Sequence, residues 1–335
     1  MAIEIRKPGL ATSVQDAGRP GYYNIGIPLS GALDQYAFRL ANLLVGNDEG
    51  AAALETTFLG PDLEAAAPVT VAVTGAPLEL RRNGEAAPMW VALALKPGDR
   101  LQGGQAVAGV RSYICVHGGI DVPELLGSRS TYLLGRFGGI GGRTIAAADM
   151  LATGTPRRSA AELTGRRLDP RLLPTFPEVA ELRIVMGLCS YRLTEESIAQ
   201  FLNTPWEVST EADRIGYRIH GAGFHFRDRE PPFGAGSDPS NVVDVGYPVG
   251  SIQVPGGKEG ILLMRDAVTG GGYATIGTVI QCDLDRVAQA APRTRFRFRA
   301  VTIQDALRLR AQYKARLRAL ADSLALFDNV GWLGQ

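Results

Sequence analysis

Glycine and proline interrupt this chain at short intervals, and no other feature of the sequence restricts its fold as strongly. The 335 residues include 41 glycines and 20 prolines, which fall between short apolar stretches. Neither residue suits the interior of a helix, and turn residues between short apolar runs are typical of β-rich proteins. We therefore expect a mainly β fold with strands near residues 69–74, 89–95, 110–116, 182–187, 218–226, 261–264, 273–280 and 294–301.

The last of these segments shows the clearest alternation. Phe296, Phe298 and Ala300 lie at every second position, with an arginine before each of them. Because side chains alternate between the two faces of a strand, this pattern predicts one buried face and one solvated face. The arginine row could also bind an anion, although a solvated sheet face explains it more simply.

Few helices are expected inside the chain. Apolar residues at helical spacing predict a helix over 33–44, which Gly46 and Asn47 would end. A shorter helix is expected near 198–202, with Thr194 placed as its N-cap.

A longer helix is expected near the C-terminal end of the sequence. Thr302 and Asp305 have the spacing of a capping box, with Asp in place of Glu. An apolar stripe at helical spacing then follows, at Leu309, Tyr313, Leu317, Leu320 and Leu324. The continuous stripe favours a helix that packs on the core or on a partner.

The length of the chain exceeds that of one ordinary domain and suits two. Residues 152–178 are rich in proline, arginine and small residues, and no helix or strand period continues through them. We therefore place the boundary in this segment, which gives an N-terminal domain over 1–165 and a C-terminal domain over 170–335.

Charge and composition exclude several classes of protein. Lysine plus arginine number 35 against 34 acidic residues, so neither nucleic acid nor an anionic membrane is expected as a partner. The three cysteines are scattered and form no CxxC, which argues against disulfides and a zinc site. Without an apolar leader or an apolar run long enough to span a membrane, a cytoplasmic location is expected.

Common catalytic motifs are absent from the sequence. It contains no GxSxG, no HExxH and no Walker A motif. The glycine-rich stretch at 135–143 is expected to be a loop with positive φ, or a flexible lip over a substrate. The three histidines, His117, His220 and His225, share no metal-ligand spacing, so no metal is predicted.

Polar residues embedded in glycine-rich turns are the remaining candidates for a site. The segment 15–34 carries Gln15, Asp16, Arg19, Ser30 and Asp34 ahead of the first predicted helix, whose N-terminus would suit an anionic or carbonyl oxygen. Two further segments of this kind carry Asp213, Arg214, Gln253, Asp266, Thr269 and Tyr273. Three such segments are better explained by one shared cleft than by unrelated turns, although a neighbouring Asp–Arg pair is commonly a structural ion pair.

The same segments resemble the allophanate hydrolase subunit 2 family. Its members are also known as biotin-dependent carboxyltransferases, as the C-type subunit of 5-oxoprolinase and as kinase-inhibitor antagonists. The resemblance runs in order along nearly the whole chain, through QDAGR at 15–19, GIPLSGALD at 26–34, GSRST at 127–131, DRIGYR at 213–218, GSIQVP at 250–255 and GGGY at 270–273. The sequence departs from the family pattern at NVVD, 241–244, which leaves the substrate class open.

The resemblance implies two cyclophilin-like β-barrel domains, followed here by the C-terminal helix. It also implies two partner proteins, a kinase-inhibitor-like B-type subunit and a lactam-utilisation A-type subunit, and a complex that uses ATP to open a cyclic amide. The residues expected to be catalytic are Asp16, Arg19, Asp213, Arg214 and Asp266. Those expected to bind substrate are Gln15, Ser30, Asp34, Ser130, Gln253, Thr269 and Tyr273.

Three functions fit this resemblance. The first is the C-type subunit of an ATP-dependent 5-oxoprolinase-like hydrolase of cyclic amides, with ATP used by the complex. The second is the carboxyltransferase subunit of a urea or amide carboxylase, with biotin supplied in trans. Biotin would have to come from another chain, because none of the four lysines here lies in a biotinyl motif. The third is a non-enzymatic regulator that binds a kinase-inhibitor-like protein.

Overall fold

The computed structural model describes residues 2–230 and 233–326, which divide into two compact units. Unit 1 comprises residues 2–19, 30–175 and 315–326, and unit 2 comprises residues 20–29 and 176–314, apart from the two that are not described. The division is not a single cut in the sequence, since 20–29 belongs to unit 2. The predicted boundary between independently folding domains stays a prediction.

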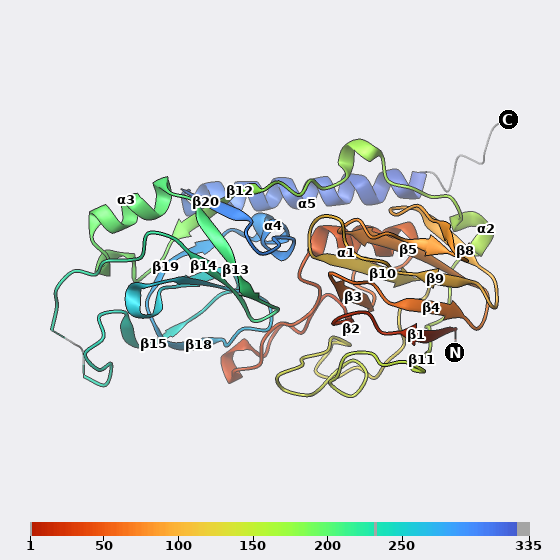
Figure 1. The fold of residues 1–335 in the computed structure, drawn as a ribbon, viewed down its shortest axis with the longest axis horizontal. Helices are drawn as coiled ribbons and strands as arrows, with labels where there is room; N and C mark the ends of the chain where they lie inside the picture. Colours follow the sequence, from red (N-terminus) through yellow and green to blue (C-terminus); the bar gives the residue numbers. More distant parts are fainter. Residues whose placement is uncertain (1, 231–232, 327–335) are drawn as a thin grey trace. The chain divides into compact units, whose positions relative to one another are not determined.

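Unit 1 contains two β-sheets (Figure 1). In spatial order the first contains β11 (Met150–Leu151), β1 (Ile3–Lys7), β4 (Asp62–Ala65), β9 (Arg100–Gln102), β6 (Arg81–Arg82) and β7 (Glu85–Ala86). The second contains β2 (Ser13–Gln15), β3 (Ala53–Thr57), β10 (Arg111–Val116), β5 (Val69–Gly75) and β8 (Ala92–Leu95).

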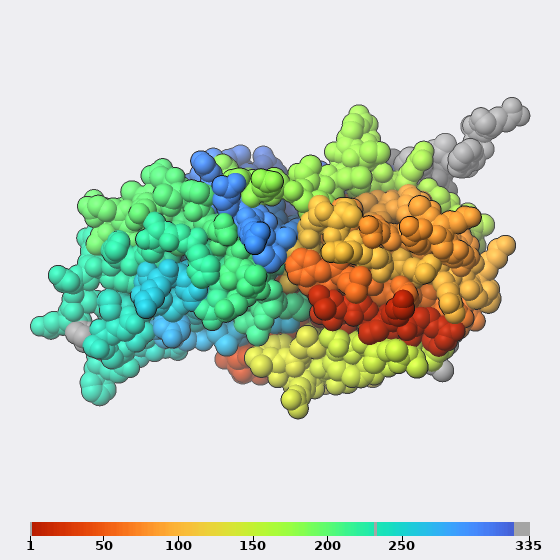
Figure 2. All heavy atoms as spheres, viewed as in Figure 1, coloured from red at the N-terminus to blue at the C-terminus, as the bar shows by residue number. Residues whose placement is uncertain are grey.

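A long loop between β10 and β11 returns alongside the N-terminal strands. The Thr131 amide donates to the Val14 carbonyl, and the Ala148 amide donates to the Ile5 carbonyl. Figure 2 shows this yellow segment beside the red N-terminal one. The loop thereby places residues near 130 next to the end of β2.

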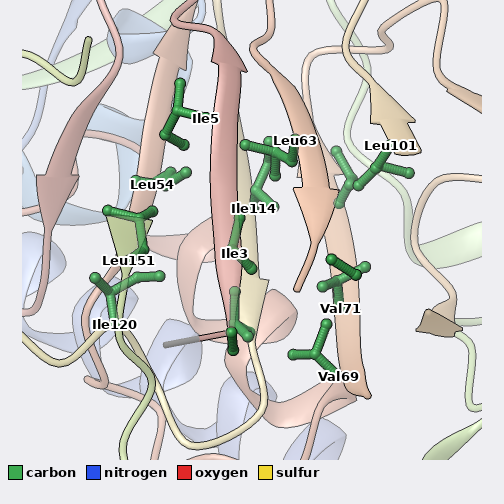
Figure 3. Close-up of a cluster of buried hydrophobic side chains, with 14 of the residues drawn as sticks. Ile3, Ile5, Leu54, Leu63, Val69, Val71, Leu101, Ile114, Ile120 and Leu151 are labelled. Atoms are coloured by element: carbon green, nitrogen blue, oxygen red, sulfur yellow. The ribbon is translucent and has the colours of Figure 1, made fainter. Parts of the chain in front are cut away.

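The two sheets of unit 1 enclose one hydrophobic core (Figure 3). Ile3 and Ile5 of β1 lie in this cluster with Leu54 of β3 and Ile114 of β10, all at most 1% exposed. Alternation along each strand supplies these inward side chains, and their burial from water is the main favourable term for folding.

Helix α1 (Gln35–Leu44) packs on β5 and β10 of the second sheet. Its N-cap is Asp34, whose carboxylate accepts from the Ala37 amide at 2.9 Å, and it ends before Gly46, which has φ 71°. The predicted helix and its stop are confirmed.

The segment 152–178 is partly structured. It contains α2 (Ala160–Leu163), capped by Ser159, and η2 (Pro170–Leu172). Leu163 and Leu168 are buried, and Arg167 pairs with Val91. Elements this short show no helix or strand period in the sequence, and the two buried leucines pack the segment on unit 1.

Unit 2 contains a closed barrel of seven strands. In spatial order these are β12 (Val179–Met186), β19 (Thr275–Val279), β16 (Ser251–Gln253), β17 (Gly260–Leu263), β14 (Gly216–His220), β13 (Trp206–Ala212) and β20 (Arg295–Ala300). The β12–β20 pair is parallel and closes the ring, while all other neighbouring strands of the barrel pair antiparallel. A separate two-stranded sheet joins β15 (Asn241–Gly246) and β18 (Gly270–Tyr273).

Aromatic side chains fill part of the core of unit 2. Phe201 of α3 (Glu195–Asn203) stacks on Phe298 with ring centroids 4.5 Å apart, and Trp206 stacks on Phe224 at 4.8 Å. The Thr194 hydroxyl caps α3 by accepting from the Ser197 amide at 3.1 Å. This confirms the predicted helix and its cap.

Short helical turns complete unit 2. They are η1 (Tyr23–Ile25), η3 (Ser190–Arg192), η4 (Pro255–Gly257), η5 (Gln281–Asp283) and α4 (Leu284–Ala288).

Some predicted strands differ from those observed. The segment 273–280 divides, because β18 pairs with β15 and β19 joins the barrel. The predicted strand at 218–226 ends at His220, before Gly221 and Gly223. On β20 the buried positions of Phe296 and Phe298 are confirmed, whereas Ala300 is exposed. Alternation failed there because the strand ends at Ala300.

The last described helix is α5 (Ile303–Leu326), in which residues 303–314 belong to unit 2 and 315–326 to unit 1. The Thr302 hydroxyl accepts from the Asp305 amide at 3.1 Å, as its capping-box spacing predicted. Leu317, Leu320 and Leu324 are buried, which confirms that the apolar stripe packs on the protein. Across the described residues, no helix combines the length and apolarity that a membrane crossing requires.

The expected fold class is confirmed. The chain is mainly β with few helices, and it carries the predicted C-terminal helix. The strands close into a ring in unit 2, whereas those of unit 1 pair as two facing sheets.

Candidate functional site

Asp16 lies at the centre of a buried polar network in unit 1. One carboxylate oxygen, Oδ1, accepts from the Ser128 hydroxyl and the Gly18 amide, both at 2.7 Å, and from the Ser130 hydroxyl. The other, Oδ2, accepts from the Arg129 amide at 2.6 Å. Asp16 is only 8% exposed, so these protein groups replace the water that an open carboxylate would bind.

Two neighbours of Asp16 hold the same loop. Arg19 is fully buried, donates to the Ser130 carbonyl at 2.5 Å and lies 4.9 Å from the centroid of the Phe137 ring. Gln15 donates to the Thr131 carbonyl at 3.1 Å and accepts from the Gly31 amide at 3.1 Å. These contacts attach the glycine-rich loop to the N-terminal segment, so the structure brings together Gln15, Asp16, Arg19 and Ser130.

The glycine-rich loop needs its glycines. Gly138, Gly139, Gly141 and Gly142 all have positive φ, which confirms the predicted loop conformation. At Gly142 a Cβ atom would lie 2.0 Å from the Arg136 carbonyl carbon, so no larger residue fits.

A second buried network surrounds Glu55, which was not among the predicted site residues. Its Oε2 accepts from the Tyr113 hydroxyl and the Leu33 amide, both at 2.8 Å, while Arg111 lies 3.7 Å from Oε1. Burial, and then the Glu55 carboxylate, raise the pKa of Tyr113 well above its ordinary value. The Asp34 amide donates to the same hydroxyl at 2.8 Å.

The two remaining predicted residues at this end of unit 1, Asp34 and Ser30, are buried as well. Asp34 caps α1, and Ser30 is fully buried with φ 49°. No spacing in the sequence connects Glu55 with Arg111 and Tyr113, because strand pairing brings these residues together.

In unit 2 two of the residues predicted to be catalytic, Arg214 and Asp266, form a buried ion pair. Arg214 donates to both carboxylate oxygens of Asp266, at 2.8 and 3.1 Å, and both side chains are largely buried. Asp213 is exposed and accepts from the Ile215 and Gly216 amides. Arg214 thus pairs with Asp266, while the turn directs the Asp213 carboxylate back onto its own backbone.

Three of the predicted substrate-binding residues meet at Tyr247. The Tyr247 hydroxyl donates to the Tyr273 carbonyl at 2.9 Å and accepts from the Tyr273 amide at 2.7 Å. It also bonds to the Gln253 side chain, and the Tyr247 amide donates to the Thr269 carbonyl at 2.9 Å. Burial raises the pKa of Tyr247. The contacts fix the backbone of Tyr273 and leave its ring 43% exposed.

The exposed ring of Tyr273 lines a pocket of about 440 Å³ on unit 2. Its walls come from β14, β17, β18 and the turn at 255–259, through Arg218, His220, Pro255, Lys258, Glu259, Ile261 and Tyr273. The lining combines three basic side chains and one carboxylate with the apolar side chains of Pro255 and Ile261. It could bind a small polar molecule that carries both charge and N–H groups.

The charged side chains of this pocket are only partly paired. Arg218 lies 2.7 Å from Glu211 and also contacts Glu259, whereas His220 Nδ1 lies 3.9 Å from Glu259 Oε2. Lys258 forms no ion pair within residues 2–230 and 233–326.

Of the residues that line this pocket, Tyr273 alone was among the predicted site residues. A signal for two others was present, because Arg218 and His220 are two residues apart on one strand and so share its outer face.

A second polar hollow of about 420 Å³ lies near the start of β15. Arg192, which is 4% exposed, and Arg229 both donate to the Asn241 carbonyl at 2.7 Å. Burial, and then the charge of Arg229, lower the pKa of Arg192. The unusual stretch 241–244 thus begins next to two clustered cations.

Groups of three or more His, Cys, Asp or Glu residues that could hold a metal ion were not found among the described residues. The three cysteines are free thiols, of which Cys115 and Cys189 are buried.

Comparisons with known proteins agree with this fold. A sequence model described as "Carboxyltransferase domain, subdomain A and B" matches residues 25–300, so the chain belongs to this carboxyltransferase family. The C-type subunit of the Escherichia coli 5-oxoprolinase is 35% identical over 320 residues, which are 95% of this chain and 97% of that protein. The family predicted from the sequence is confirmed.

Larger proteins contain a similar region. The urea amidolyase of Saccharomyces cerevisiae is 32% identical over 99% of this chain, but the chain spans only 18% of that protein's length. The crystal structure of the Kluyveromyces lactis urea carboxylase matches 100% of this chain and 30% of its own, with a TM-score of 0.88 and 32% identity. The relatives are therefore components of enzymes of two kinds.

Proposed function

We propose that this chain is the C-type subunit of an ATP-dependent 5-oxoprolinase-like hydrolase of cyclic amides. The observation that carries the proposal is the near end-to-end match with the corresponding E. coli 5-oxoprolinase protein, 95% of one chain against 97% of the other. The pocket beside Tyr273 supports it, because its mixed lining suits a small molecule with both a charge and an amide.

The proposal includes two partners, the kinase-inhibitor-like B-type subunit and the lactam-utilisation A-type subunit. Partners are expected because the sequence has no Walker A motif to hold ATP, and because Asp16 and Asp266 are engaged by protein groups. Binding the amide is the role proposed for this chain, and ATP is used by the complex. The free thiols support a reducing, cytoplasmic location.

The test is reconstitution. ATP hydrolysis that depends on 5-oxoproline is expected when this chain is combined with both partner proteins, and negligible turnover is expected from the chain alone. Avidin is expected to leave the activity unchanged, and bicarbonate should not be required. Robust turnover by the single purified chain would contradict the proposed partnership.

The match to urea carboxylase favours a second candidate, a carboxyltransferase subunit that receives a carboxyl group from biotin on another chain. The match covers the whole of this chain at a TM-score of 0.88. Inhibition by avidin, or label from bicarbonate in the product, would establish this function in place of the first. Binding of the kinase-inhibitor-like partner without any turnover would instead indicate the non-enzymatic regulator.

A further inference from the structure

The pocket beside Tyr273 leaves two charged groups of opposite sign available to a ligand. The ammonium group of Lys258 has no carboxylate partner in the described part of the chain. Glu259 contacts Arg218 through Oε1, and its Oε2 lies 3.9 Å from His220 Nδ1 and accepts no hydrogen bond from any described residue. An anion-binding group and a hydrogen-bond acceptor therefore line the same pocket.

The surrounding contacts hold this lining in place. Arg218 lies between Glu211 and Glu259, which fixes the Glu259 carboxylate and uses the charge of Arg218 within the protein. Strand pairing sets Arg218 beside Ile261, and the Tyr247 hydroxyl holds both backbone polar groups of Tyr273. A site whose lining is fixed before binding loses less conformational entropy when the ligand enters.

The arrangement discriminates between ligands by charge and hydrogen bonding. A simple carboxylate would meet Lys258 but would also face the like charge of Glu259, and a simple cation would be repelled by Lys258. A molecule that carries a carboxylate beside an N–H donor, as 5-oxoproline does, satisfies both groups. Pro255, Ile261 and the Tyr273 ring supply apolar surface for the hydrocarbon part of such a molecule.

We propose that this pocket binds a small carboxylated amide, with its carboxylate at Lys258 and its amide N–H at Glu259. The inference rests on the proposed function, and it names the site and the feature of the substrate that is recognised. Urea and 2-pyrrolidinone offer N–H groups but no carboxylate. Both should therefore bind here much more weakly than 5-oxoproline does.

Isothermal titration of the full chain with 5-oxoproline, 2-pyrrolidinone and urea tests the proposal. We expect binding of 5-oxoproline, and a loss of affinity of about tenfold or more in Lys258→Met, which removes a charge-assisted contact. Lys96→Met is the matched control, since Lys96 is an exposed lysine of unit 1, and it should bind as wild type does. Glu259→Gln should weaken the binding of 5-oxoproline as well.

Equal affinity of Lys258→Met and wild type for 5-oxoproline would overturn the proposal, as would equal affinity for 2-pyrrolidinone and 5-oxoproline. The reconstituted complex separates this failure from failure of the proposed function. Normal 5-oxoproline-dependent ATP hydrolysis with an unchanged KM in Lys258→Met would reject the pocket and keep the function. Selective binding at Lys258 by a chain whose complex never hydrolyses ATP would keep the pocket and reject the function.

Discussion

The network around Asp16 and the pocket beside Tyr273 use the same kinds of side chain in opposite ways. In unit 1, Asp16 is 8% exposed and Arg19 is fully buried, and protein groups surround the carboxylate. In unit 2, the side chain of His220 is 57% exposed, and Lys258 faces a hollow without an ion pair among the described residues.

The difference shows that burial decides what a polar group can do. A buried carboxylate must be hydrogen-bonded by the protein, because leaving water without new partners costs several kcal/mol. Such a group stabilises the fold and has little hydrogen-bonding capacity left for a ligand. A half-exposed group keeps its water until a ligand replaces it, so removing it should change binding more than stability.

The largest effect is expected from breaking the buried ion pair of unit 2. Arg214→Ala should lower the free energy of unfolding by about 3–5 kcal/mol, because it leaves the Asp266 carboxylate buried without its cation. Urea unfolding of the purified chain measures this. The double variant Arg214→Met with Asp266→Leu should recover most of the loss, and a single variant as stable as wild type would contradict the assigned role.

The next effect concerns the network of unit 1. Asp16→Ala should lower the free energy of unfolding by about 2–4 kcal/mol, since four donors from the loops at 18 and 128–130 lose their acceptor. Asp121→Ala is the control, because Asp121 is half exposed and its one ion pair among the described residues is with the partly exposed Arg129. It should change the free energy of unfolding by less than about 1 kcal/mol. Similar losses in both variants would remove the contrast between buried and exposed carboxylates.

Asp99 gives an intermediate case that depends on pH. Hydrogen bonds from Asn83, the Lys96 amide and Arg82 lower the pKa of this carboxylate to about 2. Because the folded pKa is depressed, the stabilisation is complete above the unfolded pKa near 3.8 and is lost as the pH falls toward 2. Solvent screening limits it to about 1 kcal/mol.

The measurement compares wild type and Asp99→Asn by urea unfolding at pH 5 and pH 2.5. The fall in stability between these pH values should be about 1 kcal/mol smaller in the variant, which cannot titrate at this position. An identical fall in both proteins would show that Asp99 contributes nothing to acid unfolding.

The smallest effect on stability is expected at the pocket. Lys258→Met should change the free energy of unfolding by less than about 0.5 kcal/mol, because the side chain is exposed and has no ion pair among the described residues. The same variant is expected to weaken 5-oxoproline binding. A large loss of stability would mean that the pocket, like the Asp16 network, serves the fold.

Local signals in the sequence predicted most of the regular structure. The caps at Thr194 and Thr302 were found because an N-cap and its partner lie three residues apart. The buried face of β20 was also predicted from a local pattern, because side chains alternate between the faces of a strand and Phe296 and Phe298 are two residues apart. The segment 160–172 was missed because two isolated leucines carry no period.

The order of motifs along the chain determined the family, and the frequent turn residues between short apolar runs determined the mainly β fold class. Both signals can be read from the sequence because turns, caps and alternation are encoded within a few residues. Only the tertiary structure decided the partner of each charge. Arg214 meets Asp266 across 52 residues, and Arg218 meets Glu259 across 41. Such distances are closed by strand pairing, and whether a charge ends buried or open depends on everything packed around it. That is why the sequence selected Asp16 and Tyr273 alike, while the structure encloses one and exposes the other.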